Sequence, residues 1–178
     1  MSGRYYTHSG SPSASVVMTE NRLYFTPIFL PYSASFDRIG YQIAVAAGDA
    51  EYQTRLGLYA DSAGRPGNLI VDAGLDAAGT NVGGRTVTIS QSLIGWVWGC
   101  IIGNRNGGAT GTQATVRGHA TDSAFWDVGH ATPDTNNLIN ALYHDQTVGS
   151  WGAYVLPTAA PTLTTANAVG ASTFLRAA

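Results

Sequence analysis

The stretch that most constrains the fold covers residues 52–103, where short apolar runs are separated by turn-forming residues. Along residues 55–60 apolar side chains occupy every second position, which is the spacing of a half-buried β-strand. A segment rich in glycine, serine and proline follows at residues 61–67, and the chain becomes apolar again at Leu69–Val71. This order predicts a β-hairpin with a long connecting loop.

The loop residues have separate roles in turning the chain. The Asp61 side chain can accept hydrogen bonds from backbone N–H groups close to it in the chain, and Gly64 tolerates a positive φ. Pro66–Gly67 suits the two central positions of a type II turn. We therefore expect a type II turn at Pro66–Gly67.

Other strand-like runs recur at intervals of roughly ten residues. They cover residues 16–18, 23–30, 36–47, 86–90, 96–102, 151–156 and 172–176.

Individual runs carry further information about their place in a sheet. Pro27 lacks a backbone N–H, so the run that contains it is expected at a sheet edge or at a bulge. From Ile39 onward one face of the third run is apolar, as in an antiparallel strand with one face in water. Trp96–Ile102 is continuously apolar and is expected to be buried on both faces. Pro31–Ala34 and Gln91–Gly95 are expected to be loops between strands.

This pattern predicts an all-β protein. We expect an antiparallel jelly-roll β-sandwich of about eight strands, because a jelly roll is one way of protecting sheet edges. The single short helix candidate begins behind Pro133–Thr135 and would include Leu138, Ile139 and Leu142. The expected domain organisation is an N-terminal arm at residues 1–15 and one jelly-roll domain at residues 16–178.

Composition argues against several function classes. The nine basic residues are all arginine and are dispersed along the chain, which predicts no nucleic-acid interface. Cys100 is the only cysteine, so no disulfide can form within the chain, and we expect it to be a buried, inert thiol. No apolar run reaches the length of a membrane span, and the first residues lack the pattern of a signal peptide. We expect no membrane insertion.

The sequence also lacks familiar catalytic and metal-binding patterns. It contains no Gly-x-Ser-x-Gly nucleophile elbow and no His-Glu-x-x-His. His119, His130 and His144 do not have the spacing of a metal site. The expectation is therefore a protein that is not an enzyme and that has no cofactor and no metal.

One segment resembles a motif of tailed-bacteriophage structural proteins. It reads RLGLYADSAGRPGNLIVDAG, at residues 55–74. The opening Tyr-Tyr, the Phe-Asp-Arg-Ile-Gly strand and the terminal Phe-Leu-Arg-Ala-Ala are also similar to that family. The resemblance implies a jelly roll like those of carbohydrate-binding modules, displayed on tail fibres, head fibres or capsids. It also implies a virion location, assembly in the host cytoplasm, and other virion proteins as partners.

Sugar-binding residues are expected in the weakly patterned region 119–154, since loops commonly carry function. Aromatic rings can stack on the apolar faces of sugars while polar side chains bind hydroxyl groups. The candidate glycan-binding residues are Trp126, Tyr143, His144, Asp145, Trp151 and Tyr154. The alternative is that Trp126 and Trp151 cap the core. Tyr5 and Tyr6 are candidates for docking on the virion, or are simply ordered against the first strand.

Two functions follow from these expectations. The first is adhesion, in which a virion-surface domain binds host cell-surface polysaccharide. The alternative is a capsid decoration or cement protein that stabilises the particle through protein contacts only. In either case we expect a homo-oligomer, with a trimer as one form that virion appendages take.

Overall fold

The computed structural model describes residues 2–7, 14–48, 51–77, 80–105, 111–119, 141–148, 150–166 and 170–178. Within these residues every regular element is a β-strand, except for one 3₁₀ turn at Trp151–Ala153. All ladders between the strands are antiparallel. The predicted all-β, antiparallel class is therefore confirmed, whereas jelly-roll connectivity stays a prediction.

The strands vary greatly in length. They are β1 (Tyr5–Tyr6), β2 (Ala14–Val17), β3 (Arg22–Val45), β4 (Tyr52–Ser62), β5 (Arg65–Asp76), β6 (Gly83–Arg105), β7 (Thr115–His119), β8 (Ala141–Asp145), β9 (Thr164–Ala166), β10 (Gly170–Ala171) and β11 (Phe174–Ala177).

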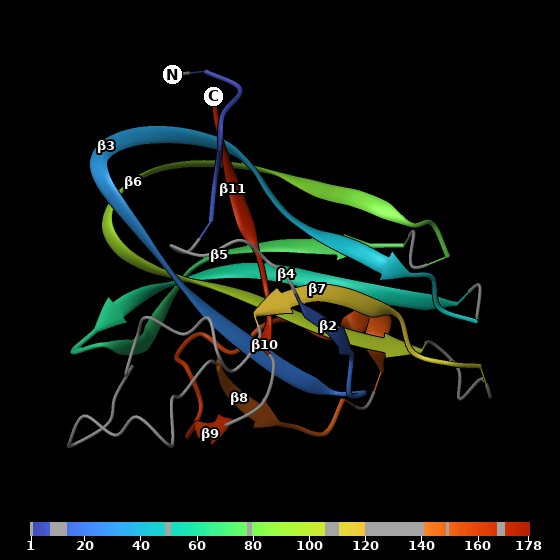
Figure 1. The fold of residues 1–178 in the computed structure, drawn as a ribbon. Helices are drawn as coiled ribbons and strands as arrows, with labels where there is room; N and C mark the ends of the chain where they lie inside the picture. The colour runs from blue at the N-terminus through green and yellow to red at the C-terminus, as the bar shows by residue number, and fades with distance from the viewer. Residues whose placement is uncertain are drawn as a thin grey trace.

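The long strands β3 and β6 form the centre of the sheet. The main strand order is β1-β11-β3-β6-β4-β5, and shorter strands β7 and β8 pair with other parts of β3. Both long strands bend sharply at the left of Figure 1, and the two chain ends lie together where β1 pairs with β11. The sheet therefore curves around on itself and produces two packed layers.

The bends correct two sequence-based expectations. Pro31–Ala34 and Gln91–Gly95 were expected to separate strands, but both lie inside continuous strands, β3 and β6. The β3–β6 register shifts between Leu30 and Ala34, and Gly95 has a φ of 76°. A bulge of this kind accommodates turn-forming residues without ending the ladder.

The hairpin between β4 and β5 is tighter than predicted. Its turn consists of Ala63 and Gly64, with φ values of 52° and 78°. Positive φ at both central residues is typical of a two-residue type I′ hairpin turn, whose twist matches that of the strands. The Gly64 N–H donates to Asp61 Oδ2 at 3.2 Å, as the sequence suggested. The type II turn at Pro66–Gly67 was wrong, because these residues already belong to β5.

Two hydrophobic cores lie on opposite sides of β6. Val97 and Ile101 belong to the larger core, and Trp98, Cys100 and Ile102 belong to the smaller one. Successive side chains of a strand point to opposite faces, so a continuously apolar strand needs a cover on both sides. The predicted burial of this run on both faces is confirmed.

The segment after β8 covers the smaller core. Residues 151–156 were expected to form a strand, but they form the 3₁₀ turn and an irregular extension. Trp151 and Leu156 are buried there beside Trp98. The helix candidate behind Pro133 lies outside the described residues up to position 140, and Leu142 is part of β8.

A buried polar network ties β3, β4, β5 and β6 together. Tyr41 Oη donates to Asp76 Oδ2 at 2.9 Å, and Thr54 Oγ1 donates to Tyr41 Oη at 2.6 Å. Arg85 contributes two hydrogen bonds to the Asp76 carboxylate, at 3.0 and 2.7 Å. Burial raises the pKa of Tyr41, so the phenol stays protonated and remains a donor.

We predict that Asp76→Ala lowers the free energy of unfolding by about 3–5 kcal/mol, because Arg85 and Tyr41 would lose a buried partner. The control is Asp145→Ala, which removes an ion pair whose carboxylate side chain is 58% exposed and should cost about 1 kcal/mol or less. Urea unfolding of the three proteins measures both losses. Equal losses would contradict a supporting role for the network.

Candidate functional site

The structure places the predicted sugar-binding residues on β8 and on the segment that covers the smaller core. Tyr143, His144 and Asp145 are consecutive in β8, whereas Trp151 and Tyr154 lie in and just after the 3₁₀ turn. Trp126 lies outside the described residues.

The Arg22 side chain contacts two of the β8 residues, Tyr143 and Asp145. Its guanidinium lies 4.1 Å from the centre of the Tyr143 ring and pairs with Asp145 at 2.5 and 2.8 Å. The hydrogen bond and charge of Arg22 lower the pKa of Asp145. His144 Nδ1 donates to the carbonyl oxygen of Thr162 at 2.9 Å. These polar groups therefore already have partners within the protein.

The rings of Trp151 and Tyr154 stack on each other. Trp151 and Tyr154 are nearly parallel, with ring centres 5.5 Å apart and an interplanar angle of 8°. Trp151 is only 3% exposed. Gln146 donates to the Tyr154 hydroxyl, and burial raises the pKa of Tyr154 to about 12.

This arrangement supports the core-capping alternative for Trp151. A ring that is almost fully buried cannot stack on a sugar, so Trp151 is not part of a sugar-binding surface. Tyr143 keeps partial exposure, but Arg22 covers one of its ring faces. The described members of the set pack against two different cores, Tyr143 against the larger and Trp151 and Tyr154 against the smaller, and do not form one open platform.

A different place in the fold has an open hollow of about 570 Å³. It forms beside β3, where two neighbours share one edge of that strand. β11 pairs with β3 up to Gly40, and β7 pairs with it from Ile43. Ser172 and Thr173, which connect β10 to β11, cross the interval between them. The volume lies in the range of small-molecule sites.

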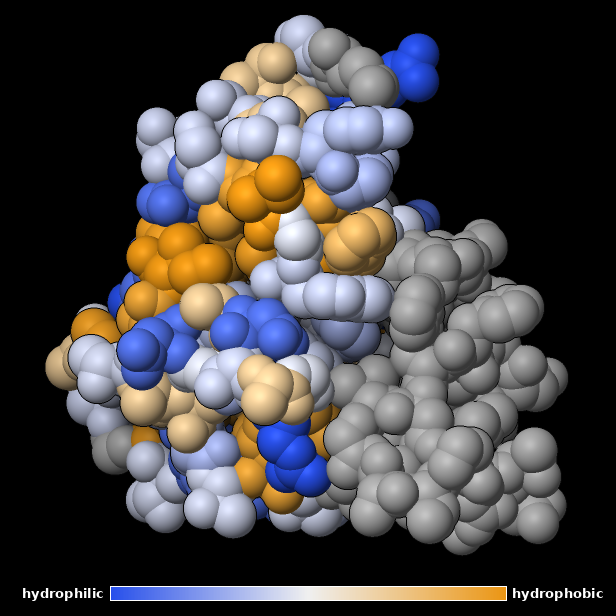
Figure 2. Space-filling view, turned by 90° about the vertical axis from the view of Figure 1, so that its left-hand side faces the viewer, coloured by the Kyte–Doolittle hydropathy of each residue, from blue (hydrophilic) through white to orange (hydrophobic). Residues whose placement is uncertain are grey.

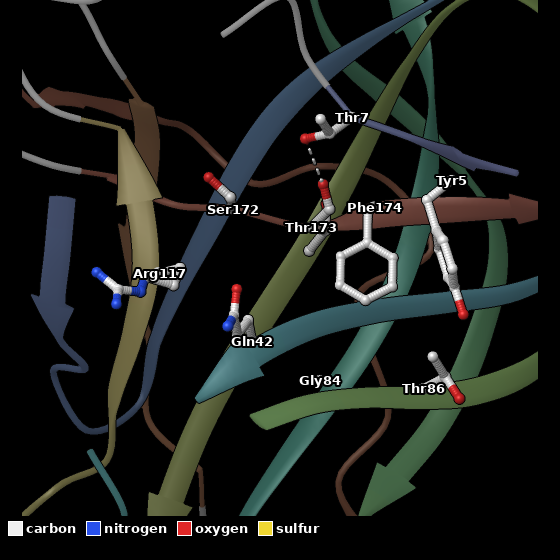
Figure 3. Close-up of a pocket in the computed structure, with 9 residues that line it drawn as sticks. All are labelled: Tyr5, Thr7, Gln42, Gly84, Thr86, Arg117, Ser172, Thr173 and Phe174. Carbon is white, nitrogen blue, oxygen red and sulfur yellow. Dashed lines mark hydrogen bonds between the residues drawn. The ribbon is translucent and has the colours of Figure 1, made fainter. Parts of the chain in front are cut away.

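Two aromatic rings form one side of the hollow (Figure 3). Phe174 pairs with Gly40, and its ring lies where a Cβ on Gly40 would be. Tyr5 meets Phe174 edge to face, with ring centres 5.2 Å apart, and is 58% exposed. Glycine at position 40 thus leaves room for the Phe174 ring against the sheet, and the N-terminal strand adds the second ring.

Polar side chains form the floor and the opposite edge. Gln42 projects from the outer face of the sheet, because the preceding Tyr41 points into the core. Thr86, which is exposed, pairs with Gly40 on the neighbouring strand. Thr7 Oγ1 donates to the carbonyl oxygen of Thr173 at 3.3 Å, the dashed line in Figure 3. Arg117 lies at the edge opposite Tyr5.

Two buried hydroxyl groups beside the hollow have no hydrogen-bond partner among the described residues. They are Ser172 Oγ and Thr173 Oγ1. Thr173 Oγ1 faces the backbone at Gly99 and so is turned toward β6. Unsatisfied buried polar groups are uncommon in native proteins, and a binding site is one place where they occur.

The hollow can bind a ligand that has both apolar and polar surfaces. None of the described side chains that line it is a carboxylate, histidine or cysteine; its hydroxyl groups belong to serine, threonine and tyrosine. In the part of the chain that the structure describes, no group of three His, Cys, Asp or Glu side chains is placed to hold a metal ion. Among the same residues, no helix has the length and hydropathy needed to cross a membrane.

Sequence reasoning found only one residue of the hollow, Tyr5, and assigned it to docking. The expected ordering of Tyr5 and Tyr6 against the first strand was wrong, because β1 pairs with the last strand, Tyr5 with Arg176 and Tyr6 with Leu175. The other lining residues come from five separate segments, so no local motif contains them. The available signal was the polar face of the third run, on which Gln42 alternates with apolar residues.

A scan against models of known protein families and a search of curated protein sequences found no match.

We predict that Trp151→Ala destabilises the fold by about 3–5 kcal/mol, the usual cost of removing a buried aromatic side chain. Tyr143→Ala is the control and should cost less, since its ring is partly exposed. Chemical unfolding followed by far-UV circular dichroism measures both. A fully stable Trp151→Ala protein would show that the ring does not cap the smaller core.

Proposed function

We propose that this chain is a non-enzymatic structural protein displayed on the surface of a tailed-phage virion, and that the hollow binds host cell-surface glycan. The virion assignment follows the sequence resemblance. The binding assignment rests on one observation, the exposed Tyr5 ring packed on the half-buried Phe174 ring beside polar side chains.

The chemistry of the hollow matches that of a sugar. A pyranose ring has an apolar face that packs on an aromatic ring, and hydroxyl groups around its rim that need hydrogen-bond partners. Tyr5 and Phe174 offer the first, and Gln42 and Thr86 offer the second from the wet face of the sheet. The hollow is open to solvent on that face, so part of a long polysaccharide could enter without threading its ends.

The lining also favours binding over catalysis. Glycoside hydrolysis generally requires a pair of carboxyl groups that flank the bond to be cleaved. In the described part of the chain, the side chains that line the hollow include no such pair. We therefore propose that glycan is held and released unchanged.

Filling the hollow tests this proposal. A Cβ at Gly84 would meet no atom within 4 Å, and the residue has no positive φ, so Gly84→Leu should fold normally while occupying the ligand's space. We expect at least about a 10-fold loss of affinity for host-envelope polysaccharide, which corresponds to about 1.4 kcal/mol. Surface plasmon resonance on immobilised polysaccharide measures it.

The matched control is Gly152→Leu, a glycine with equal room that lies in the 3₁₀ turn and does not line the hollow. It should bind like the unmodified protein. If both variants bind equally well, the hollow is not the sugar site. If the unmodified protein itself binds no polysaccharide, glycan recognition is excluded and the decoration role remains.

A second candidate function, particle decoration, is favoured by a different surface. Exposed apolar side chains gather where β3 and β6 bend, namely Phe29, Tyr32 and Ile94, beside the half-buried Trp96. Figure 2 shows hydrophobic residues clustered on this side of the molecule. A hollow of about 340 Å³ lies next to Tyr32, between Tyr6 and the C-terminal Ala178. Patches of this kind commonly mark protein–protein contacts.

For this surface we predict that Ile94→Asp abolishes co-sedimentation with virions that lack the protein, because a charge in a dry interface is poorly tolerated. Ile94 is 64% exposed, so the variant should keep its unfolding midpoint. Val17→Asp, at a similarly exposed valine on β2, is the control and should still co-sediment. Retained binding by both variants would argue against docking through the bend.

A further inference from the structure

Arg117 differs from the four arginines of the described chain that form ion pairs. Arg22, Arg55, Arg85 and Arg176 each pair with an aspartate on a neighbouring segment. Arg117 is half-buried and lines the hollow, yet its guanidinium forms no hydrogen bond or ion pair with any residue that the structure describes.

The backbone of Arg117 is nevertheless firmly held. Its strand β7 pairs with β2, where Ser15 is opposite Arg117, and with β3 through Val116. The Ser172 N–H donates to the Arg117 carbonyl oxygen at 3.1 Å. The backbone of Arg117 is therefore fixed beside the hollow, while its guanidinium donors have no partner among the described residues.

Among the described residues, no counter-charge pairs with this guanidinium. The described side chains that line the hollow include no aspartate or glutamate. A cation that is partly withdrawn from water and lacks a counter-charge attracts anions to the cavity it borders. The neighbouring Gln42 and Ser172 add hydrogen-bonding groups, and Ser172 Oγ has no partner among the described residues.

We propose that the hollow is selective for acidic glycan, and that Arg117 binds the carboxylate of a uronic acid or related sugar. This inference rests on the proposed glycan function. A guanidinium can give two parallel hydrogen bonds to a carboxylate, a geometry that neutral hydroxyl groups do not reproduce.

The positions of the lining residues allow one side of the hollow to bind a sugar ring and the other to bind its carboxylate. Tyr5 and Phe174 lie on one side of the hollow and Arg117 lies on the other, with Gln42 between them (Figure 3). A sugar ring packed on the aromatic side can direct an acidic substituent toward the guanidinium. The same arrangement gives a neutral sugar the stacking contact but leaves the cation unpaired.

A paired glycan array tests the proposal. The probes are bacterial polysaccharides with and without uronic acids, and the same uronate-containing samples after chemical reduction of their carboxyl groups to alcohols. We expect binding to the uronate-containing set, at least about 10-fold weaker binding after carboxyl reduction, and weaker binding at higher salt.

Arg117→Gln should weaken binding to uronate-containing polysaccharide by the same factor, whereas Arg65→Gln should leave this binding unchanged. Arg65 lies at the tip of the β4–β5 hairpin, so its replacement makes an equal change in net charge away from the hollow. Both variants should keep the unfolding midpoint of the parent, which confirms that any loss is not one of folding.

The outcomes are distinct. Binding to uronate-containing glycan that requires both the carboxylate and Arg117 supports the inference. Binding that is unchanged by carboxyl reduction or by Arg117→Gln overturns acid selectivity and leaves the glycan function intact. No binding of the parent protein to any polysaccharide overturns both.

Discussion

The burial of one strand on both faces determines most of this structure. Residues Trp96–Ile102 of β6 send alternate side chains into two separate cores. A strand in this position needs paired neighbours on both edges, which β3 and β4 provide, and a cover over each face. The bent halves of the long strands cover one face, and the segment around Trp151 and Leu156 covers the other. The cover of the second face is irregular. Apolar contacts hold it together with scattered hydrogen bonds, such as that from the Leu156 N–H to Asp72 Oδ2 at 2.9 Å, and with an isolated bridge between Asn68 and Ala159.

The hollow follows from the length of β3. No single neighbour spans its outer edge, so β11 and β7 occupy successive parts of it and diverge between Gly40 and Ile43. The alternation of side chains then fixes the chemistry at that point. Tyr41 turns inward to the Asp76 network, and Gln42 turns outward into the hollow. The same period-two pattern that builds the core therefore supplies a polar floor where the sheet opens.

The sequence was a good guide where one physical cause dominated. The face from Ile39 onward and the buried run Trp96–Ile102 followed from periodicity, and the role of Gly64 followed from its freedom to adopt a positive φ. It was a poor guide where the same residue types occur both in loops between strands and in bends within a strand. Pro31–Ala34 and Gln91–Gly95 have the composition of loops, but long-range pairing between them converts each into a bend within a ladder. The hollow could not be predicted from the sequence for a related reason. Its side chains come from distant parts of the chain and meet only when the strands have paired.

The N-terminal strand β1 contributes to both proposed binding surfaces, the glycan-binding hollow and the docking surface at the bend. Tyr5 and Tyr6 are adjacent in an extended chain, so their rings point to opposite sides. The Tyr5 ring meets Phe174 at the hollow, whereas the Tyr6 ring meets Phe36, edge to face at 5.6 Å, beside the second hollow near the bend. β1 is also the outer strand that covers β11. Deleting the arm would thus expose a sheet edge and disturb both surfaces at once, and for this reason only single side chains can separate recognition of glycan from docking on the particle.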